Sequence, residues 1–240
     1  MSYEAFAYYY DSLMDADFYK DYVQFIKEHA DFQTVLELGC GTGEIAVRLA
    51  KRKKEVYATD LSKDMLEVAR MKASRQNVEL MLGRIDMRDF IVDQKLDLVL
   101  CLCDSLNYII ERDEVKKTFV NCFNAIKDDG CFIFDVDSIY KMENILKDYL
   151  EENDDPDFYF KWKVDSLGYG HVVHHVEIID KIENEHVSEE HIQKTLTVDE
   201  YKNMLLEVGF KDIEIYSDFG EYHDDCERVI FVCRKEAKWW

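Results

Sequence analysis

The chain has 240 residues, 48% of them hydrophobic, which suffices for one sizeable core or for one core with an appended subdomain. A formal net charge of -21 at pH 7 makes most of the surface repel phosphates, which disfavours a nucleic-acid partner. Seven cysteines without a Cys-x-x-Cys pair, and no apolar run near the roughly 18 residues of a membrane span, indicate a cytoplasmic protein with reduced thiols.

The N-terminal segment is rich in aromatic residues. Their spacing through residues 3–29 predicts two short helices, the second capped by Asp15 or Asp17. A free tail would not carry so many aromatic side chains. We therefore expect residues 1–30 to form a helical flap that either covers the mouth of a ligand pocket or packs on the sheet.

A glycine-rich turn follows the first predicted strand. Residues 35–38 are an apolar run typical of a buried parallel strand, and Gly39, Gly41 and Gly43 then make a turn without Cβ atoms to block a ligand. A helical pattern begins at Glu44, and a second apolar run ends at Asp60. This order of strand, turn, helix and acid-terminated strand predicts a nucleoside pocket, in preference to a plain structural turn.

The glycine spacing indicates which nucleoside cofactor fits. The chain has Gly-x-Gly-x-Gly, whereas dinucleotide enzymes use Gly-x-Gly-x-x-Gly to place a helix N-terminus under a pyrophosphate. Glu44 lies in the first helical turn, where a carboxylate opposes a bound phosphate. A cofactor without phosphate and with a cationic centre fits this turn better than a nicotinamide dinucleotide.

The following elements alternate between strand and helix. We expect strands near 34–38, 55–60, 78–82, 96–101 and 131–136, and helices near 44–51, 63–75 and 112–127. A turn over 128–130 leads into the fifth strand. This alternation predicts an α/β fold with a mostly parallel sheet covered by helices on both faces.

The pattern changes after Asp137. A helix near 138–150 and an acidic stretch with the only proline precede three extended segments, near 158–165, 170–181 and 185–196, which predict an antiparallel meander. A helix over 198–208, capped by Gly209, and strands near 211–216 and 228–233 complete the chain. We therefore divide the chain into a flap (1–30), a core (31–137 and 198–236) and a β cap insertion (138–197).

Four segments in this order carry a family resemblance. Glu37-x-Gly-x-Gly-x-Gly resembles motif I of the class I S-adenosylmethionine-dependent methyltransferases, and residues 56–62, 83–87 and 96–101 resemble their next three motifs. The resemblance implies a Rossmann-like, seven-stranded, mostly parallel sheet whose last two strands form an antiparallel pair, with the antiparallel β insertion after strand five. It also implies S-adenosyl-L-methionine as cofactor.

The resemblance further implies roles for individual residues. Gly39 and Gly41 would line the methionine part and the ribose, Asp60 would accept hydrogen bonds from the ribose hydroxyls, and Leu61 and Met65 would sandwich the adenine. The expected cofactor site is completed by Tyr10, Glu37, Cys40, Gly43, Asp86, Met87 and Cys103. Of these, Asp86 would accept the adenine amino group, Cys103 would offer its carbonyl to the cofactor's ammonium, and Tyr10 would reach the cofactor carboxylate.

The loop after strand four, residues 103–108, would face the methyl group. It lacks the Asn/Asp-Pro-Pro-aromatic and Pro-Cys patterns of enzymes that methylate nucleic acid bases. Asp104 and Tyr108 are candidate catalytic residues; Asp104 could act as a base, bind a cationic acceptor or only cap the loop. His175 is a candidate base in the meander, with a polar sheet face as the alternative, and no metal site is expected.

These observations favour an enzyme that transfers a methyl group directly to nitrogen or oxygen of a small molecule. The layout resembles glycine and aminosugar N-methyltransferases and uncharacterised bacterial methyltransferases. Two alternatives stay open: a tRNA methyltransferase, which a positive stripe of Arg84, Arg88 and Lys95 beside the pocket would favour, and a regulatory protein that binds the cofactor without catalysis. A homodimer is a further possibility.

Overall fold

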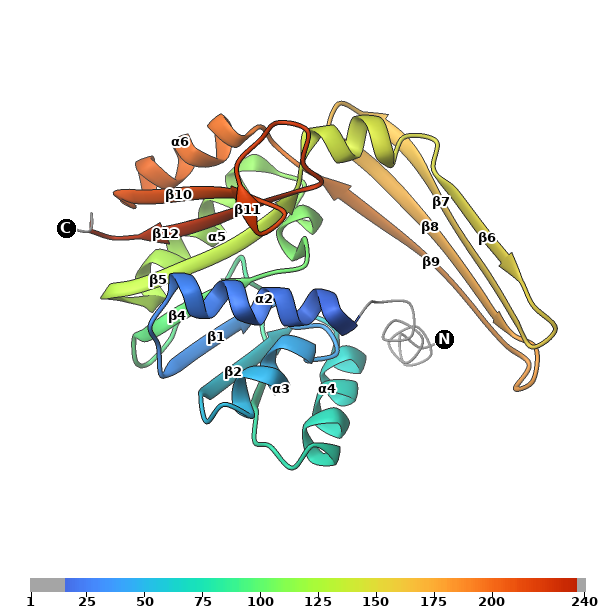
Figure 1. Ribbon diagram of the computed structural model, residues 1–240, viewed down its shortest axis with the longest axis horizontal. Coiled ribbons are helices and arrows are strands. Elements are labelled where there is room, and N and C mark those ends of the chain that lie inside the picture. Colours follow the sequence, from blue (N-terminus) through green and yellow to red (C-terminus); the bar gives the residue numbers. More distant parts are fainter. Residues whose placement is uncertain (1–15, 237–240) are drawn as a thin grey trace.

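The computed structural model describes residues 16–236, which form a central sheet with helices on both faces and a second sheet that projects from it (Figure 1). The strand order in the central sheet is β11-β10-β12-β5-β4-β1-β2-β3. Its strands are β1 Thr34–Leu38, β2 Glu55–Asp60, β3 Met81–Arg84, β4 Leu96–Cys101, β5 Ile126–Asp137, β10 Asp212–Ser217, β11 Gly220–Glu221 and β12 Arg228–Arg234. Strands β3, β2, β1, β4 and β5 are parallel, and β12 is antiparallel to both β5 and β10, which confirms the mostly parallel sheet and its antiparallel final pair.

Helices cover the two faces of this sheet and bury two apolar cores. The helices are α2 Ala16–His29, α3 Glu44–Ala50, α4 Lys63–Arg75, α5 Arg112–Ala125 and α6 Val198–Val208. On one face, α5 and α6 bury Phe119 and Tyr201 against Phe134 of β5. On the other face, α2 and α3 pack on β1, β2 and β4. Because both faces are covered, the central parallel strands β1 and β4 are buried almost throughout.

The aromatic face of α2 packs on the sheet. Tyr22 and Ile26 are fully buried there, and Phe25 is 3% exposed. Of the two interpretations of the aromatic N-terminus, packing on the sheet therefore holds for residues 16–29. The first predicted helix and Tyr10 lie outside the described residues.

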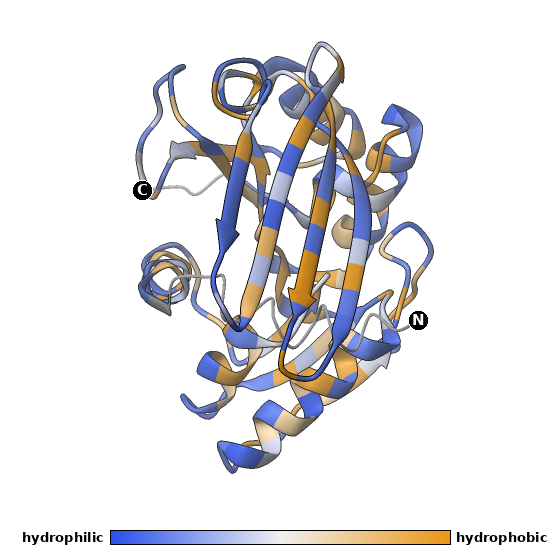
Figure 2. Ribbon diagram, turned by 90° about the vertical axis from the view of Figure 1, so that its right-hand side faces the viewer, coloured by the Kyte–Doolittle hydropathy of each residue, from blue (hydrophilic) through white to orange (hydrophobic). Residues whose placement is uncertain are grey.

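The insertion forms a four-stranded antiparallel sheet, which we call the arm: β6 Leu150–Asp154, β7 Phe158–Gly168, β8 His171–Asp180 and β9 Glu185–Lys194. Hydrophobic and hydrophilic residues alternate along its strands (Figure 2), as expected where one face packs and the other meets solvent. The predicted meander corresponds to β7, β8 and β9.

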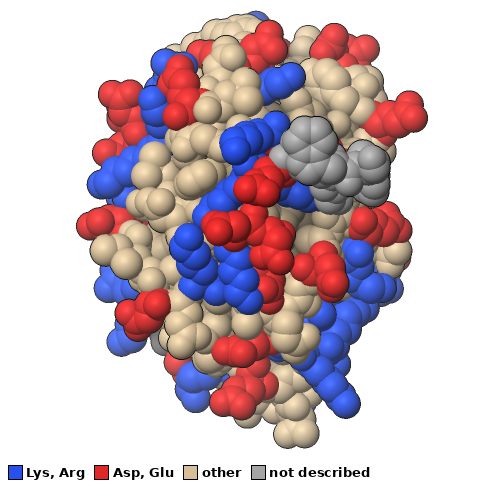
Figure 3. All heavy atoms as spheres, turned by 90° about the vertical axis from the view of Figure 1, so that its left-hand side faces the viewer, with Lys and Arg blue, Asp and Glu red and all other residues tan. Residues whose placement is uncertain are grey.

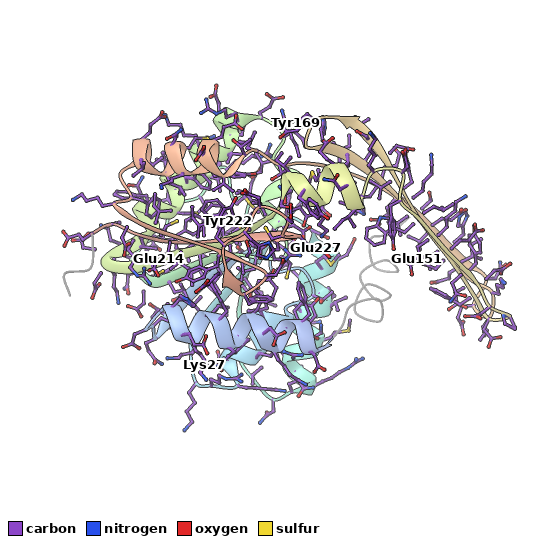
Figure 4. All side chains as sticks on the ribbon, turned by 45° about the horizontal axis from the view of Figure 1, so that its top comes forward. Lys27, Glu151, Tyr169, Glu214, Tyr222 and Glu227 are labelled. Carbon is purple, nitrogen blue, oxygen red and sulfur yellow. The ribbon has the colours of Figure 1, made fainter. Side chains whose placement is uncertain are left out.

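The start of the arm differs from the sequence expectation. The helix predicted over 138–150 is wrong in extent, because the helical segment covers only residues 139–145, of which Lys141–Ile145 is π-helical. The acidic stretch that follows is strand β6, all of it exposed, and Glu151 lies on this outer strand (Figure 4). Its carboxylates accept hydrogen bonds from other segments of the arm: Glu152 from the Tyr159 hydroxyl of β7 at 2.9 Å, and Asp154 from Lys181, just after β8, at 2.6 Å. The sequence of the acidic strand alone does not predict these partners, because they come from other segments of the chain.

Two core strands also shift. Strand β3 begins at Met81, not near 78, so that its last residue Arg84 pairs with Asp60 at the end of β2. The predicted turn at 128–130 lies inside β5 as a bulge, since Leu96 pairs with Ile126 whereas Leu98 pairs with Cys131. No helix among residues 16–236 is long and apolar enough to cross a membrane.

Candidate active site

A cavity of about 700 Å³ lies at the carboxyl ends of β1, β2 and β4, beside strand β9 of the arm. Open α/β sheets bind ligands at this edge, because the loops after successive parallel strands meet there. The cavity wall includes twelve of the residues predicted from the sequence: Glu37, Gly39, Cys40, Gly41, Asp60, Leu61, Met65, Asp86, Met87, Cys103, Asp104 and Tyr108. Gly43 and His175 do not line it.

Each of the three glycines in the turn is required for a different structural reason. All adopt a left-handed backbone, with φ of 66°, 52° and 77° at Gly39, Gly41 and Gly43. A Cβ on Gly41 would meet no atom within 4 Å, so this glycine leaves open space in the cavity, whereas a Cβ on Gly39 would lie 2.7 Å from the Ser105 side chain. A Cβ on Gly43 would lie 2.9 Å from Ala69 of α4, so Gly43 permits close packing of helices instead of ligand contact.

Asp60 holds the glycine turn and the start of α4 together. Its carboxylate accepts hydrogen bonds from the backbone N–H groups of Gly41 and Ser62, each at 2.8 Å. Burial raises the pKa of Asp60, and these N–H donors partly offset the effect. The carboxylate is therefore fixed in direction and has lone pairs left for further donors.

Glu37 provides a buried carboxyl at the floor of the cavity. It is 3% exposed, and its Oε2 has no hydrogen-bond partner within residues 16–236. Burial, reinforced by the charge of Asp60, raises the pKa of Glu37 to about 8. A buried acid with a spare oxygen fits a cationic ligand, whose charge would stabilise the carboxylate.

The loop after β4 forms the opposite end of the cavity. Asp104 precedes a 3-10 turn, Ser105–Tyr108, and its carboxylate accepts hydrogen bonds from Gln193 of β9 at 2.9 Å and from Arg228 at 3.3 Å. Tyr108 is half-exposed, and its ring lies 5.9 Å from that of His191 of β9 in an edge-to-face arrangement. The arm thus contributes side chains to this end of the cavity.

Comparison with known proteins identifies the family. A family described as "Methyltransferase domain" matches residues 35–130. A protein of Geobacillus sp. (strain WCH70), provisionally named a methyltransferase, is 37% identical over 98% of this chain and 100% of its own length. The chain belongs to the class I S-adenosylmethionine-dependent methyltransferases. The methyltransferase therefore takes S-adenosylmethionine as cofactor, and the open turn at Gly41 and the spare oxygen of Glu37 fit a ligand with a sulfonium and an ammonium group.

Two further relatives span most of the methyltransferase. A solved structure of an S-adenosylmethionine-dependent methyltransferase from Clostridium acetobutylicum ATCC 824 superposes with a TM-score of 0.86, at 27% identity and covering 97% of this chain and 98% of its own. The glycine/sarcosine N-methyltransferase of Aphanothece halophytica is 27% identical over 90% of this chain and 80% of its own length. The similarity thus includes the arm as well as the core.

The expected adenine end of the methyltransferase cavity is partly exposed. Leu61 is 54% exposed, and Met65 projects from the first turn of α4, which Ser62 caps. The Asp86 carboxylate forms an ion pair with Arg88 at 2.6 Å, and its hydrogen bonds with Arg88 lower the pKa of Asp86. A contact between Asp86 and an adenine amino group would share this carboxylate with Arg88.

The histidine that the methyltransferase brings to the cavity is His191, not His175. His175 lies on the other face of β8 from His174 and contacts the carboxylates of Glu190 at 2.9 Å and Asp165 at 3.2 Å. His174 pairs across the ladder with His191, on the face that meets the core. Burial lowers the pKa of His174 to about 4, so it is neutral at pH 7.

Sequence reasoning missed several residues of the site. Ser105, which donates a hydrogen bond to the Gly39 carbonyl at 3.1 Å, lay in a loop already singled out. By contrast, His191, Gln193 and Arg228 lie on strands far along the chain from the loop after β4. No local sequence pattern predicts that these strands contact that loop. Within residues 16–236 no cluster of three or more His, Cys, Asp or Glu side chains could hold a metal ion.

Proposed function

We propose that this methyltransferase transfers the methyl group directly to an amine nitrogen of a small molecule. The observation that carries the proposal is the way the arm is fastened over the loop after β4. Buried Asn107 donates to the Lys194 carbonyl of β9 at 2.9 Å and accepts from the backbone N–H of Asp137 at 2.8 Å. With Gln193 bound to Asp104, this leaves an acceptor space bounded by Asp104, Tyr108 and His191, which suits a small acceptor.

The chain's own residues would mainly position the reactants. The sulfonium of S-adenosylmethionine supplies an already activated methyl group, so alignment is the principal task. Glu37, Gly41 and Asp60 would hold the cofactor. Asp104 would bind the protonated acceptor amine and orient its nitrogen toward the methyl group. An ammonium must lose one proton before it can attack. We assign this proton to His191, which lines the cavity and whose Nε2 lies 3.0 Å from the Glu189 carboxylate.

The chemistry balances without a further reactant. The new nitrogen–carbon bond forms as the sulfur–carbon bond breaks, and the proton leaves through His191 to solvent. The relative from Aphanothece halophytica, named for glycine and sarcosine N-methylation, supports a nitrogen acceptor. The cavity continues past the glycine turn to Asp104 and Tyr108, which supports catalysis over cofactor binding alone.

The tRNA alternative is less well supported. Arg84 and Arg88 line the cavity, but Arg88 is paired with Asp86, and Lys95 precedes β4 at the opposite end of the sheet, where it lies 3.8 Å from Asp128. The face at that end carries acidic and basic side chains interspersed (Figure 3). The positive stripe that would favour tRNA does not form.

Transfer of a radioactive methyl group from S-adenosylmethionine tests the proposal. The protein would be incubated with a fractionated small-metabolite extract and, separately, with bulk tRNA. We expect label in an amine-containing metabolite fraction, and at least about tenfold less with Asp104→Asn, because a charge-assisted contact is lost. Asp165→Asn, on the outer face of the arm, is the matched control and should retain transfer. Label found only in tRNA would overturn the proposal.

A further inference from the structure

Asp135, near the end of β5, gathers four hydrogen-bond donors around one fully buried carboxylate. Its side chain is 0% exposed. It accepts from the backbone N–H groups of Cys103 at 2.9 Å and Asp104 at 2.6 Å, from the Tyr22 hydroxyl at 2.5 Å and from the Arg228 guanidinium at 2.6 Å. Asp135 does not line the cavity, so it touches neither the cofactor nor an acceptor there.

The two backbone donors belong to a strained segment. Cys103 and Asp104 are consecutive residues other than glycine with positive φ, 54° and 52°. Side chains disfavour this left-handed conformation, which persists only where the surroundings impose it. Because both N–H groups point to one carboxylate, Asp135 supplies that constraint. The same two residues line the cavity, and the family resemblance directs the Cys103 carbonyl at the cofactor's ammonium.

Arg228 bridges the carboxylates of Asp135 and Asp104. Its guanidinium contacts Asp135 at 2.6 Å and Asp104 at 3.3 Å, and it lies over the rings of Phe18 and Tyr22 from α2, at 5.2 and 5.8 Å. Helix α2, strand β5 and strand β12 therefore converge on the loop after β4.

We propose that Asp135 is a positioning residue that holds the Cys103–Asp104 peptide in the conformation required for cofactor binding, with Arg228 setting the direction of the Asp104 carboxylate. The inference goes beyond the proposed function, because it concerns the cofactor and holds whatever the acceptor is. A carboxylate has two equivalent acceptor oxygens, whereas an amide of the same shape has one. The inference therefore requires that asparagine at position 135 fail to hold this loop conformation.

The chain offers a closely matched control. Asp97, at the other end of the central sheet, also accepts from two backbone N–H groups (Gln33 at 2.9 Å, Thr34 at 2.8 Å), one hydroxyl (Thr34) and one cation (Lys127). Asp135→Asn and Asp97→Asn therefore each remove a carboxylate with the same kinds of donor, 0% exposed at Asp135 and 20% at Asp97, and only Asp135 binds residues that line the cavity. The probe is S-adenosylhomocysteine, titrated calorimetrically at pH 7.5.

We expect Asp135→Asn to bind S-adenosylhomocysteine at least about tenfold more weakly than the wild type, since small displacements of a binding group are costly. Asp97→Asn should bind S-adenosylhomocysteine with an affinity within about twofold of the wild type. Its melting temperature should nevertheless fall, as should that of Asp135→Asn, because each variant loses hydrogen bonds. Equal affinity of Asp135→Asn and the wild type, or equal weakening in both variants, would overturn the inference.

A second readout needs neither ligand nor activity. In the ligand-free protein, the amide protons of Cys103 and Asp104 should resonate downfield because they bind a carboxylate, and Asp135→Asn should move both upfield while Asp97→Asn moves neither. If Asp135→Asn fails to fold, Arg228→Lys takes its place: it keeps the charge but cannot bridge Asp135 and Asp104, and it should shift the Asp104 amide and weaken binding. Unchanged shifts and affinity in Arg228→Lys would count against the inference.

Discussion

Replacement of Glu37 by glutamine should make the ligand-free protein more stable and its cofactor binding weaker. The glutamine keeps the shape of a side chain that is 3% exposed but has no charge to bury. In the wild type, the folded state holds a proton on Glu37 up to a pKa of about 8, whereas the unfolded chain releases it near the ordinary value of 4.5. Above pH 4.5 the unfolded state therefore binds fewer protons, and stability falls as the pH rises toward 8.

The size of the effect follows from these two pKa values. Each pH unit between them costs the wild type about 1.4 kcal/mol, so the penalty at pH 7 is at most about 3.5 kcal/mol and at pH 5 under about 1 kcal/mol. Glu37→Gln carries no such penalty. Urea unfolding of the ligand-free protein should therefore show a stability gain for the variant that grows from pH 5 to pH 7.

Binding should change in the opposite direction. A cationic cofactor lowers the pKa of Glu37 and expels its proton, so wild-type binding at pH 7 should release a proton, seen as a calorimetric enthalpy that depends on the buffer. Glu37→Gln should release none and bind S-adenosylmethionine about 1.5–3 kcal/mol more weakly. Glu67→Gln, in an exposed pair with Arg70, is the control and should alter neither quantity. If Glu37→Gln left both the stability at pH 7 and the cofactor affinity at wild-type values, the reasoning about this buried acid would be refuted.

Three further outcomes follow from the site. Asp60→Ala should weaken S-adenosylmethionine binding by about 1–3 kcal/mol in calorimetry, and unchanged affinity would remove Asp60 from the cofactor site. Gly43→Ala should lower stability in urea unfolding by about 1–3 kcal/mol, because its Cβ would lie 2.9 Å from Ala69 at a φ of 77°; a stable variant would contradict the packing role. His191→Ala should reduce methyl transfer by about a hundredfold whereas His175→Ala retains it, and the reverse result would restore His175 as the base.

The part of the fold that depends on local patterns was predictable from the sequence. Glycines at 39 and 41, with an acid at 60, predicted the end of the sheet at which the cavity lies, because turn geometry and strand order suffice for that inference. The helix over 198–208, which ends at Gly209 as expected, is observed with the predicted bounds. Such features need no knowledge of distant contacts.

What the sequence did not reveal depends on contacts between distant segments. Strand β6 forms because an acidic stretch pairs with β7, and His191 lines the cavity, instead of His175, because of the register of the arm. The carboxylate of Asp135 gathers donors from residues 22, 103, 104 and 228, which no periodicity connects. Pairing across a sheet is set by the whole fold, not by a window of sequence.

A crystal structure of the protein with S-adenosylhomocysteine would test the central claim most directly. We expect the ribose hydroxyls to lie within hydrogen-bonding distance of Asp60, and the sulfur to face the space bounded by Asp104, Tyr108 and His191. A sulfur directed away from that space, or a ribose out of reach of Asp60, would contradict both the cofactor orientation and the acceptor site beneath the arm.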